Sequence, residues 1–104
     1  MTEIVMMTTV GSDEQATRIA RELVERRQAA CVQVLPKIRS FYRWEGKVCD
    51  DAEILLFVKT LAESYDDAAA TIRELHDYDV PEIIALDIQR GDPEYLEWMR
   101  NNVG

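Results

Sequence analysis

Histidine and glycine are scarce in this chain of 104 residues, and their scarcity limits the chemistry open to it. His76 is the only histidine, and the four glycines are isolated from one another. A Ser-His-Asp or Cys-His apparatus needs a histidine beside its nucleophile, and a phosphate-binding loop needs clustered glycines. We therefore expect a protein that binds or assembles, not an enzyme, and no nucleotide-binding loop.

Cysteines and long apolar runs are also few. Cys31 and Cys49 are too few for a disulfide framework and lack CxxC spacing, which fits a reducing compartment. No apolar run reaches the roughly 18 residues that a membrane-spanning helix needs, and the N-terminal MTEIVMMTTV has no basic region typical of a signal peptide. These absences predict a cytoplasmic protein with no membrane partner.

Basic residues are outnumbered by acidic ones, 12 to 20, for a formal charge of −8. Nucleic-acid binding draws much of its affinity from clustered lysine and arginine, so we expect no nucleic-acid partner. One local basic stretch interleaves with aromatic residues; it comprises Lys37, Arg39, Arg43 and Lys47 beside Phe41, Tyr42 and Trp44. We interpret it as solvated strand faces or ion pairs between subunits.

The patterning of the remaining residues predicts one α+β domain over residues 1–104. Residues 3–10 are an apolar, β-branched run that predicts a buried strand. Ser12, with Gln15 as its capping-box partner, begins a helix expected over residues 13–28. Further on, Ser64 begins a second helix, residues 82–88 form a buried strand, and Asp92-Pro93 opens a third helix.

The most informative segment is a long hairpin with strands over residues 30–44 and 48–61 and a turn at 45–47. Pro36 interrupts its first arm, as expected at a bulge or an edge. Each arm has about fourteen residues and extends for more than about 40 Å, whereas a compact domain of this length has a radius of gyration of about 13 Å. The tip must overhang the domain, and an overhanging strand edge favours pairing with another copy of the chain. The register also places Cys31 and Cys49 too far apart for a disulfide.

The resulting order, β-α-β-β-α-β-α, matches a ferredoxin-like βαββαβ unit with one added C-terminal helix. Its densest set of metal-competent groups lies between His76 and Glu82 and includes Asp77, Tyr78 and Asp79. The alternative is that His76 caps the second helix. Cys31 is either a thiol nucleophile or, as we expect, a small hydrophobic residue at a strand end. Lys59 points either into a ligand pocket or outward to solvent, and alternation leaves both open.

Several segments together resemble the CutA family of divalent-cation tolerance proteins. They are ARELVERRQAACVQVLP (20–36), IRSFYRWEGKV (38–48), EILLFVKT (53–60), LHDYDVPEIIALDI (75–88) and YLEWM (95–99). The similarity covers nearly the whole chain in order. It implies a ferredoxin-like protomer in an intertwined trimer similar in architecture to the PII signalling proteins, and an association with copper and other divalent cations.

The resemblance also implies roles for individual residues. Cys31 and His76 fall where the metal ligands proposed for the family lie, and Asp77 and Glu82 add carboxylates nearby. Tyr42, Trp44, Lys59, Tyr78 and Glu82 match positions that line clefts between subunits. The sequence departs from the family where Asp77 replaces a usual proline and Gln33 a frequent asparagine, and Cys49 belongs to no family motif.

We therefore expect a homotrimer that binds a divalent metal ion, Cu²⁺ foremost, without turnover and without needing the metal to fold. One alternative is a PII-like sensor that holds a small organic ligand in the cleft through Lys59, Tyr42 and Trp44. Another is a structural trimer whose metal affinity is incidental.

Overall fold

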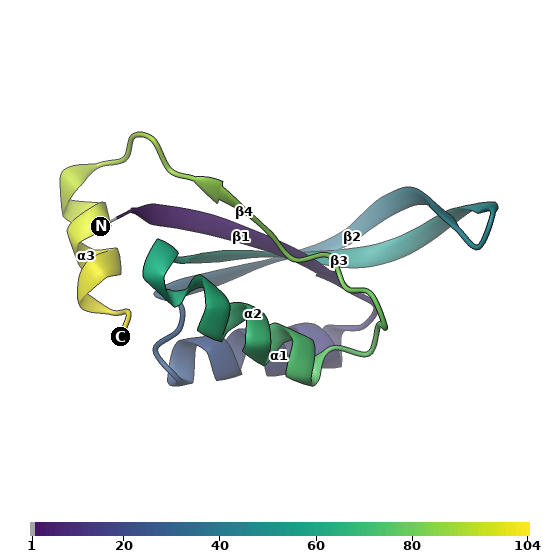
Figure 1. Cartoon of the computed structure of the whole chain (residues 1–104), viewed down its shortest axis with the longest axis horizontal. Helices are drawn as coiled ribbons and strands as arrows, with labels where there is room; N and C mark the ends of the chain where they lie inside the picture. Colours follow the sequence, from purple (N-terminus) through teal and green to yellow (C-terminus); the bar gives the residue numbers. More distant parts are fainter. Residues whose placement is uncertain (1) are drawn as a thin grey trace.

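The computed structural model describes residues 2–104 as one four-stranded antiparallel sheet with helices against it (Figure 1). In chain order the elements are β1 (Glu3–Val10), α1 (Asp13–Glu25), β2 (Cys31–Trp44), β3 (Lys47–Leu61), a 3₁₀ turn (Ala62–Ser64), α2 (Tyr65–Leu75), β4 (Ile84–Asp87) and α3 (Pro93–Asn101). The strands lie side by side in the order β2-β3-β1-β4. The predicted ferredoxin-like order with an added C-terminal helix is confirmed.

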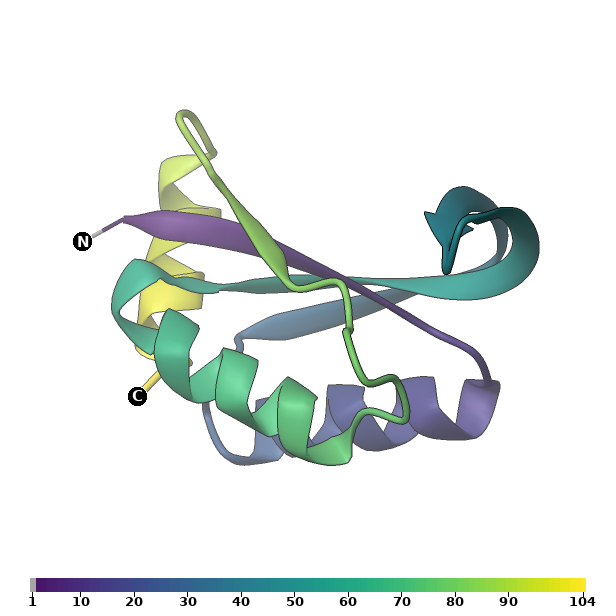
Figure 2. The same cartoon turned by 45° about the vertical axis from the view of Figure 1, so that its right-hand side comes forward.

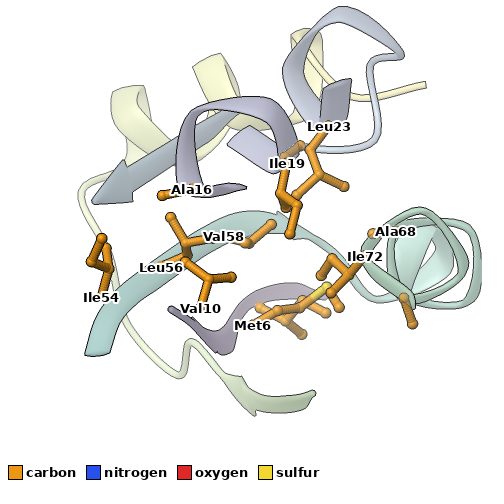
Figure 3. Close-up of a cluster of buried hydrophobic side chains, with 13 residues drawn as sticks. Met6, Val10, Ala16, Ile19, Leu23, Ile54, Leu56, Val58, Ala68 and Ile72 are labelled. Atoms are coloured by element: carbon orange, nitrogen blue, oxygen red, sulfur yellow. The ribbon is translucent and has the colours of Figure 1, made fainter. Parts of the chain in front are cut away.

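The core lies between one face of the sheet and helices α1 and α2, which run side by side beneath it (Figures 1 and 2). Figure 3 shows the side chains that meet there: Ile19 and Leu23 from α1, Ile72 from α2, and Met6 and Val58 from the sheet. All five are fully buried. The helical spacing of apolar residues in α1 therefore faces the sheet, as the sequence predicts.

Helix α1 is shorter than predicted and is capped differently at its ends. Ser12 Oγ accepts from the backbone N–H of Gln15 at 3.2 Å, but the Gln15 amide donates to the carbonyl of Leu75 at 3.1 Å, so the expected capping box is only half made. The helix ends at Glu25 rather than at residue 28 because Arg27 adopts a left-handed backbone with φ 58°. That conformation turns the amide of Gln28 back to the carbonyl of Leu23 at 2.9 Å and closes the helix.

Ser64 is the N-cap of α2, as predicted, although its side chain makes no capping hydrogen bond because it closes a 3₁₀ turn. The predicted bounds and burial of the last strand were wrong. The last strand spans Ile84–Asp87 rather than 82–88, and every residue in it is exposed in the single chain. It is an edge strand that pairs only with β1, so nothing else in the described chain covers it. Asp92 caps α3 as predicted and accepts from the N–H of Tyr95 at 3.1 Å.

The hairpin of β2 and β3 extends beyond the rest of the sheet, and its tip curls away from the core (Figures 1 and 2). The register slips between Leu35 and Ile38, which places the predicted irregularity at Pro36. Glu45 and Gly46 both have positive φ, 50° and 79°, as a tight two-residue hairpin turn requires. The chain measures 44 Å along its longest axis against 25 and 22 Å across. The overhang is therefore confirmed.

The same register separates the two cysteines. Cys31 pairs with Lys59 and Cys49 pairs with Tyr42, ten residues apart along β3. At roughly 3.3 Å per residue this separation is about 33 Å, far beyond disulfide range. Both thiols are free, as predicted.

The sheet face opposite α1 and α2 is covered only at one end, by α3 (Figure 1). Strand alternation places half-buried or exposed apolar side chains on this open face; they include Val5, Met7, Leu55, Phe57, Ile84 and Leu86. Cys31 and Lys59 lie on the same face. Across residues 2–104, no helix is both long and apolar enough to cross a membrane.

We expect Leu23→Ala to lower the free energy of unfolding by about 2–5 kcal/mol, because a fully buried leucine leaves a cavity when it is truncated. The neighbouring Val24 is 43% exposed, so Val24→Ala is the matched control and should change stability by less than about 1 kcal/mol. Urea unfolding at one fixed protein concentration measures both. Equal losses in the two variants would contradict the described core.

Candidate functional site

A groove of about 610 Å³ lies between the curled hairpin and the segment that precedes β4. Its lining residues come from the end of β1, from both arms of the hairpin and from that segment: Thr9, Ser40, Phe41, Tyr42, Trp44, Glu53, Tyr78, Asp79, Val80 and Glu82. Four of these side chains are aromatic and three are acidic. The groove thus unites residues from four separate parts of the sequence at the base of the overhanging hairpin.

Glu53 and Tyr78 form the floor of this groove. Tyr78 Oη donates to Glu53 Oε2 at 2.8 Å, and Glu53 is only 8% exposed. Burial, followed by the hydrogen bond to Glu53, raises the pKa of Tyr78 well above its ordinary value. The phenol therefore stays a proton donor to Glu53 at physiological pH.

Tyr42 and Asp51 form a second phenol–carboxylate pair on the hairpin. Tyr42 lies opposite Cys49, so Asp51 is its diagonal neighbour on the same face, and Tyr42 Oη donates to Asp51 Oδ2. This hydrogen bond is the main cause that raises the pKa of Tyr42 to about 12. Both tyrosines are thus neutral hydrogen-bond donors to carboxylates, so neither phenol balances the negative charge of its partner.

Lys59 was predicted to point either into a ligand pocket or outward to solvent. In one chain it lies half-buried on the open face, against Tyr95 of α3. Its ammonium stands 5.4 Å from the centre of the Tyr95 ring and donates to Tyr95 Oη at 3.4 Å. It therefore belongs to the end of the open face that α3 covers. The groove of one chain is lined by Tyr42, Trp44 and Tyr78, three of the residues predicted for a cleft between subunits, and not by Lys59.

His76 is held by two hydrogen bonds at the C-terminus of α2. Its Nε2 lies 2.8 Å from the carbonyl of Thr9, and its Nδ1 accepts from the N–H of Tyr78 at 3.1 Å. Nε2 therefore carries the proton, and the lone pair of Nδ1 is already engaged. A metal ion at His76 would have to displace one of these two bonds, so the alternative role, a cap of α2, describes its position in one chain.

Cys31 is half-buried at the start of β2 and lies apart from His76. Cys31 pairs with Lys59, whereas Thr9, which holds His76, pairs with Leu55, four residues or roughly 13 Å along β3. Within residues 2–104, no three His, Cys, Asp or Glu side chains are grouped so as to hold a metal ion. A single protomer thus does not bring the four predicted ligands, Cys31, His76, Asp77 and Glu82, into one site.

Sequence reasoning missed the phenol–carboxylate pairs. It linked neither Glu53 to Tyr78 nor Asp51 to Tyr42. Strand alternation offered a partial signal, because with a turn at 45–47 Asp51 falls on the same face as Tyr42. No local signal links Tyr78 to Glu53, which is 25 residues away in sequence.

We expect Asp51→Asn to lower the pKa of Tyr42 from about 12 toward its ordinary 10.0, since the carboxylate is the main cause of the shift. In the wild type, this raised pKa favours the folded state below pH 10.0, and the contribution is lost as the pH rises toward about 12. Ultraviolet absorbance during a pH titration measures the phenol. Asp50→Asn is the control because Asp50 pairs with Arg39 instead. An unmoved Tyr42 transition in Asp51→Asn would contradict the pair.

Comparison with known proteins gives a consistent assignment. The family of the CutA1 divalent ion tolerance protein matches residues 4–102. The divalent-cation tolerance protein CutA of Thermus thermophilus is 48% identical over 98% of this chain and 99% of its own length. Its solved structure superposes with a TM-score of 0.96 over 98% and 99% of the two chains.

Relatives also occur in other lineages and compartments. The chloroplastic CutA 1 protein of Oryza sativa is 44% identical over 95% of this chain, which spans only 56% of that protein. A CutA from Archaeoglobus fulgidus, described as periplasmic, has a structure 37% identical, with a TM-score of 0.95 over 98% of this chain and 99% of that one. Matched along almost its entire length in sequence and in fold, the chain belongs to the CutA family of divalent-cation tolerance proteins.

Proposed function

We propose that this protein serves divalent-cation tolerance as a homotrimer that binds a divalent metal ion, Cu²⁺ foremost, at sites completed between protomers and without turnover. One observation carries the proposal: Cys31, the softest metal ligand among the predicted residues, lies on the open sheet face rather than in a ligand cluster of its own chain. Family membership supports the role in divalent-cation tolerance.

The open face and the two sheet edges support self-association. Apolar side chains such as Ile84 and Leu86, 47% and 58% exposed, need a cover that the described chain does not supply. β2 and β4 leave one edge each unpaired, at opposite sides of the sheet. An edge of one copy joined to the other edge of the next is a heterologous contact, which forms a ring when the rotation between successive copies closes. Three subunits is the number that the family resemblance implies.

Metal preference follows from the ligand types. A thiolate favours soft or borderline ions such as copper and zinc, and carboxylates contribute charge more than selectivity. Cys31 is therefore the first ligand in this proposal, and Asp77 and Glu82 are exposed carboxylates that a site between subunits can use. His76 contributes once the ion displaces one of its two hydrogen bonds.

We propose the cytoplasm as the working compartment, because two free cysteines fit a reducing environment. The compartments named for the rice and Archaeoglobus relatives differ from this one, and those names describe only those proteins.

In calorimetric titrations, we expect saturable Cu²⁺ and Zn²⁺ binding by the wild type and an affinity at least about a hundredfold lower in Cys31→Ser, since loss of even an outer-shell partner costs 10- to 100-fold. Zn²⁺ is included because it does not oxidise the thiol. Cys49→Ser is the matched control and should bind as the wild type does. We expect His76→Ala to weaken binding less than Cys31→Ser. Equal binding by Cys31→Ser and the wild type would remove Cys31 from the site.

Light scattering should give a wild-type mass three times that of the chain. Ile84→Glu places a charge on the open face and should produce smaller species, because an unpaired charge is costly in an apolar interface. Val24→Glu is the control: Val24 is similarly exposed, 43% against 47% for Ile84, but lies on α1. A monomeric wild type would refute the trimer, and identical masses for both variants would refute the open face as its interface.

A second candidate function is favoured by the groove itself. Its volume suits a small organic molecule, and aromatic walls with a few polar groups are typical of ligand pockets. We therefore also propose that the trimer senses a small organic ligand held by Tyr42, Trp44 and Tyr78. Lys59 can join only from another protomer, because in its own chain it contacts Tyr95.

A further inference from the structure

The groove is lined by carboxylates without any basic side chain among its lining residues. Glu53, Asp79 and Glu82 line it directly, and Asp51 stands beside it through Tyr42. Arg39, which flanks the groove in sequence, is already engaged: it makes two hydrogen bonds to Asp50, at 3.3 and 2.8 Å, and lies 4.9 Å from the centre of the Phe41 ring. The groove of one chain therefore has an excess of negative charge.

Glu53 carries this charge in an unusual setting. It is more than nine-tenths buried, yet its one hydrogen bond, among residues 2–104, is the one that Oε2 accepts from the neutral phenol of Tyr78. Oε1 accepts none, and no lysine, arginine or histidine nitrogen of the described chain lies within 4.0 Å. Oε1 is not among the buried polar atoms that lack a partner, so it is open to the groove. Glu53 thus presents a vacant acceptor and a negative charge to the groove.

The walls of the groove are aromatic. Phe41 and Trp44 are 63% and 47% exposed, and Tyr42 lies between them on β2. Aromatic faces attract cations, with tryptophan the most effective, and they also accept flat apolar groups by stacking. The electrostatics and the apolar surface therefore favour the same occupant.

We infer that the groove binds an organic cation with N–H donors, a primary ammonium or a guanidinium attached to an apolar group. The N–H group of the ligand donates a hydrogen bond to Oε1 of Glu53. Asp79 and Glu82 add favourable negative charge, and the apolar part of the ligand packs on Trp44 and Tyr42. The high pKa values of Tyr42 and Tyr78 are consistent with this surplus of negative charge. This inference rests on the second proposed function and adds the chemical class of its ligand.

Three small probes of matched shape test the charge requirement on the native assembly. They are 2-phenylethylamine, which is a cation at neutral pH, its neutral analogue 2-phenylethanol, and the anion 3-phenylpropionate. Titration followed by calorimetry should show saturable binding of the amine alone, weakened by added salt. Preferential binding of the alcohol or the carboxylate would overturn the cation assignment while leaving an organic-ligand groove. Binding of none of the three would overturn both.

Substitutions of the groove carboxylates then test which of them contact the amine. Glu53→Gln keeps the shape and an acceptor for Tyr78 but removes the charge, and should weaken amine binding by about tenfold to a hundredfold. Asp79→Asn, at an exposed position that folding does not depend on, should weaken it by a smaller factor. Glu97→Gln, an exposed charge change on α3, is the control and should bind as the wild type does. Unchanged affinity in both groove variants would overturn the inference even if the amine binds.

Cys31, which does not line the groove, provides a reference for metal binding in the same experiment. Glu53→Gln should retain Zn²⁺ binding, and Cys31→Ser should retain amine binding, because the two residues lie at different positions along the sheet. Suppression of amine binding by Zn²⁺ in the wild type would indicate one shared cation site and would contradict a groove selective for an organic cation.

Discussion

Helices pack fully against only one of the two faces of the sheet, and the other features of the molecule depend on this constraint. Helices α1 and α2 cover that face and bury Met6, Val58 and their neighbours, whereas only α3 reaches the other (Figure 1). The exposed β4, the half-buried apolar residues of the open face and the hairpin that outreaches the core all follow from this arrangement. A sheet in this state is stabilised by a second layer, and we propose another copy of the chain as that layer.

This one-sided packing also explains why the functional residues are dispersed within one protomer. Cys31 lies at one end of the open face and His76 is bonded into the other layer, so the chain alone does not assemble a metal site. The groove, in contrast, is formed within the chain, because the curled hairpin (Figure 2) and the segment around Tyr78 line it together. Under the two proposals, metal binding therefore needs assembly, whereas ligand binding in the groove needs the hairpin to keep its curvature.

Much of this fold could be predicted from local patterns. The order of elements, the irregularity at Pro36, the separated cysteines and the cap at Asp92 each rest on a few neighbouring residues. What could not be predicted depends on distant contacts or on backbone detail. The left-handed Arg27 shortens α1, the Gln15 amide leaves its capping box for Leu75, and Glu53 pairs with Tyr78 across 25 positions. Lys59 was left open because alternation gives a face but not a partner, and Tyr95 comes from a helix 36 residues away.

Amide hydrogen exchange over the hairpin tip, residues 39–51, tests most directly the claim that other copies complete this chain. An isolated two-stranded ribbon is only marginally stable in water, so its amides exchange rapidly. The account predicts slow exchange at the tip in the native protein, comparable with the core strand β1, because neighbouring protomers hold the overhang in place. Rapid exchange at the tip beside a protected core would contradict it, since the hairpin would then extend into solvent unsupported.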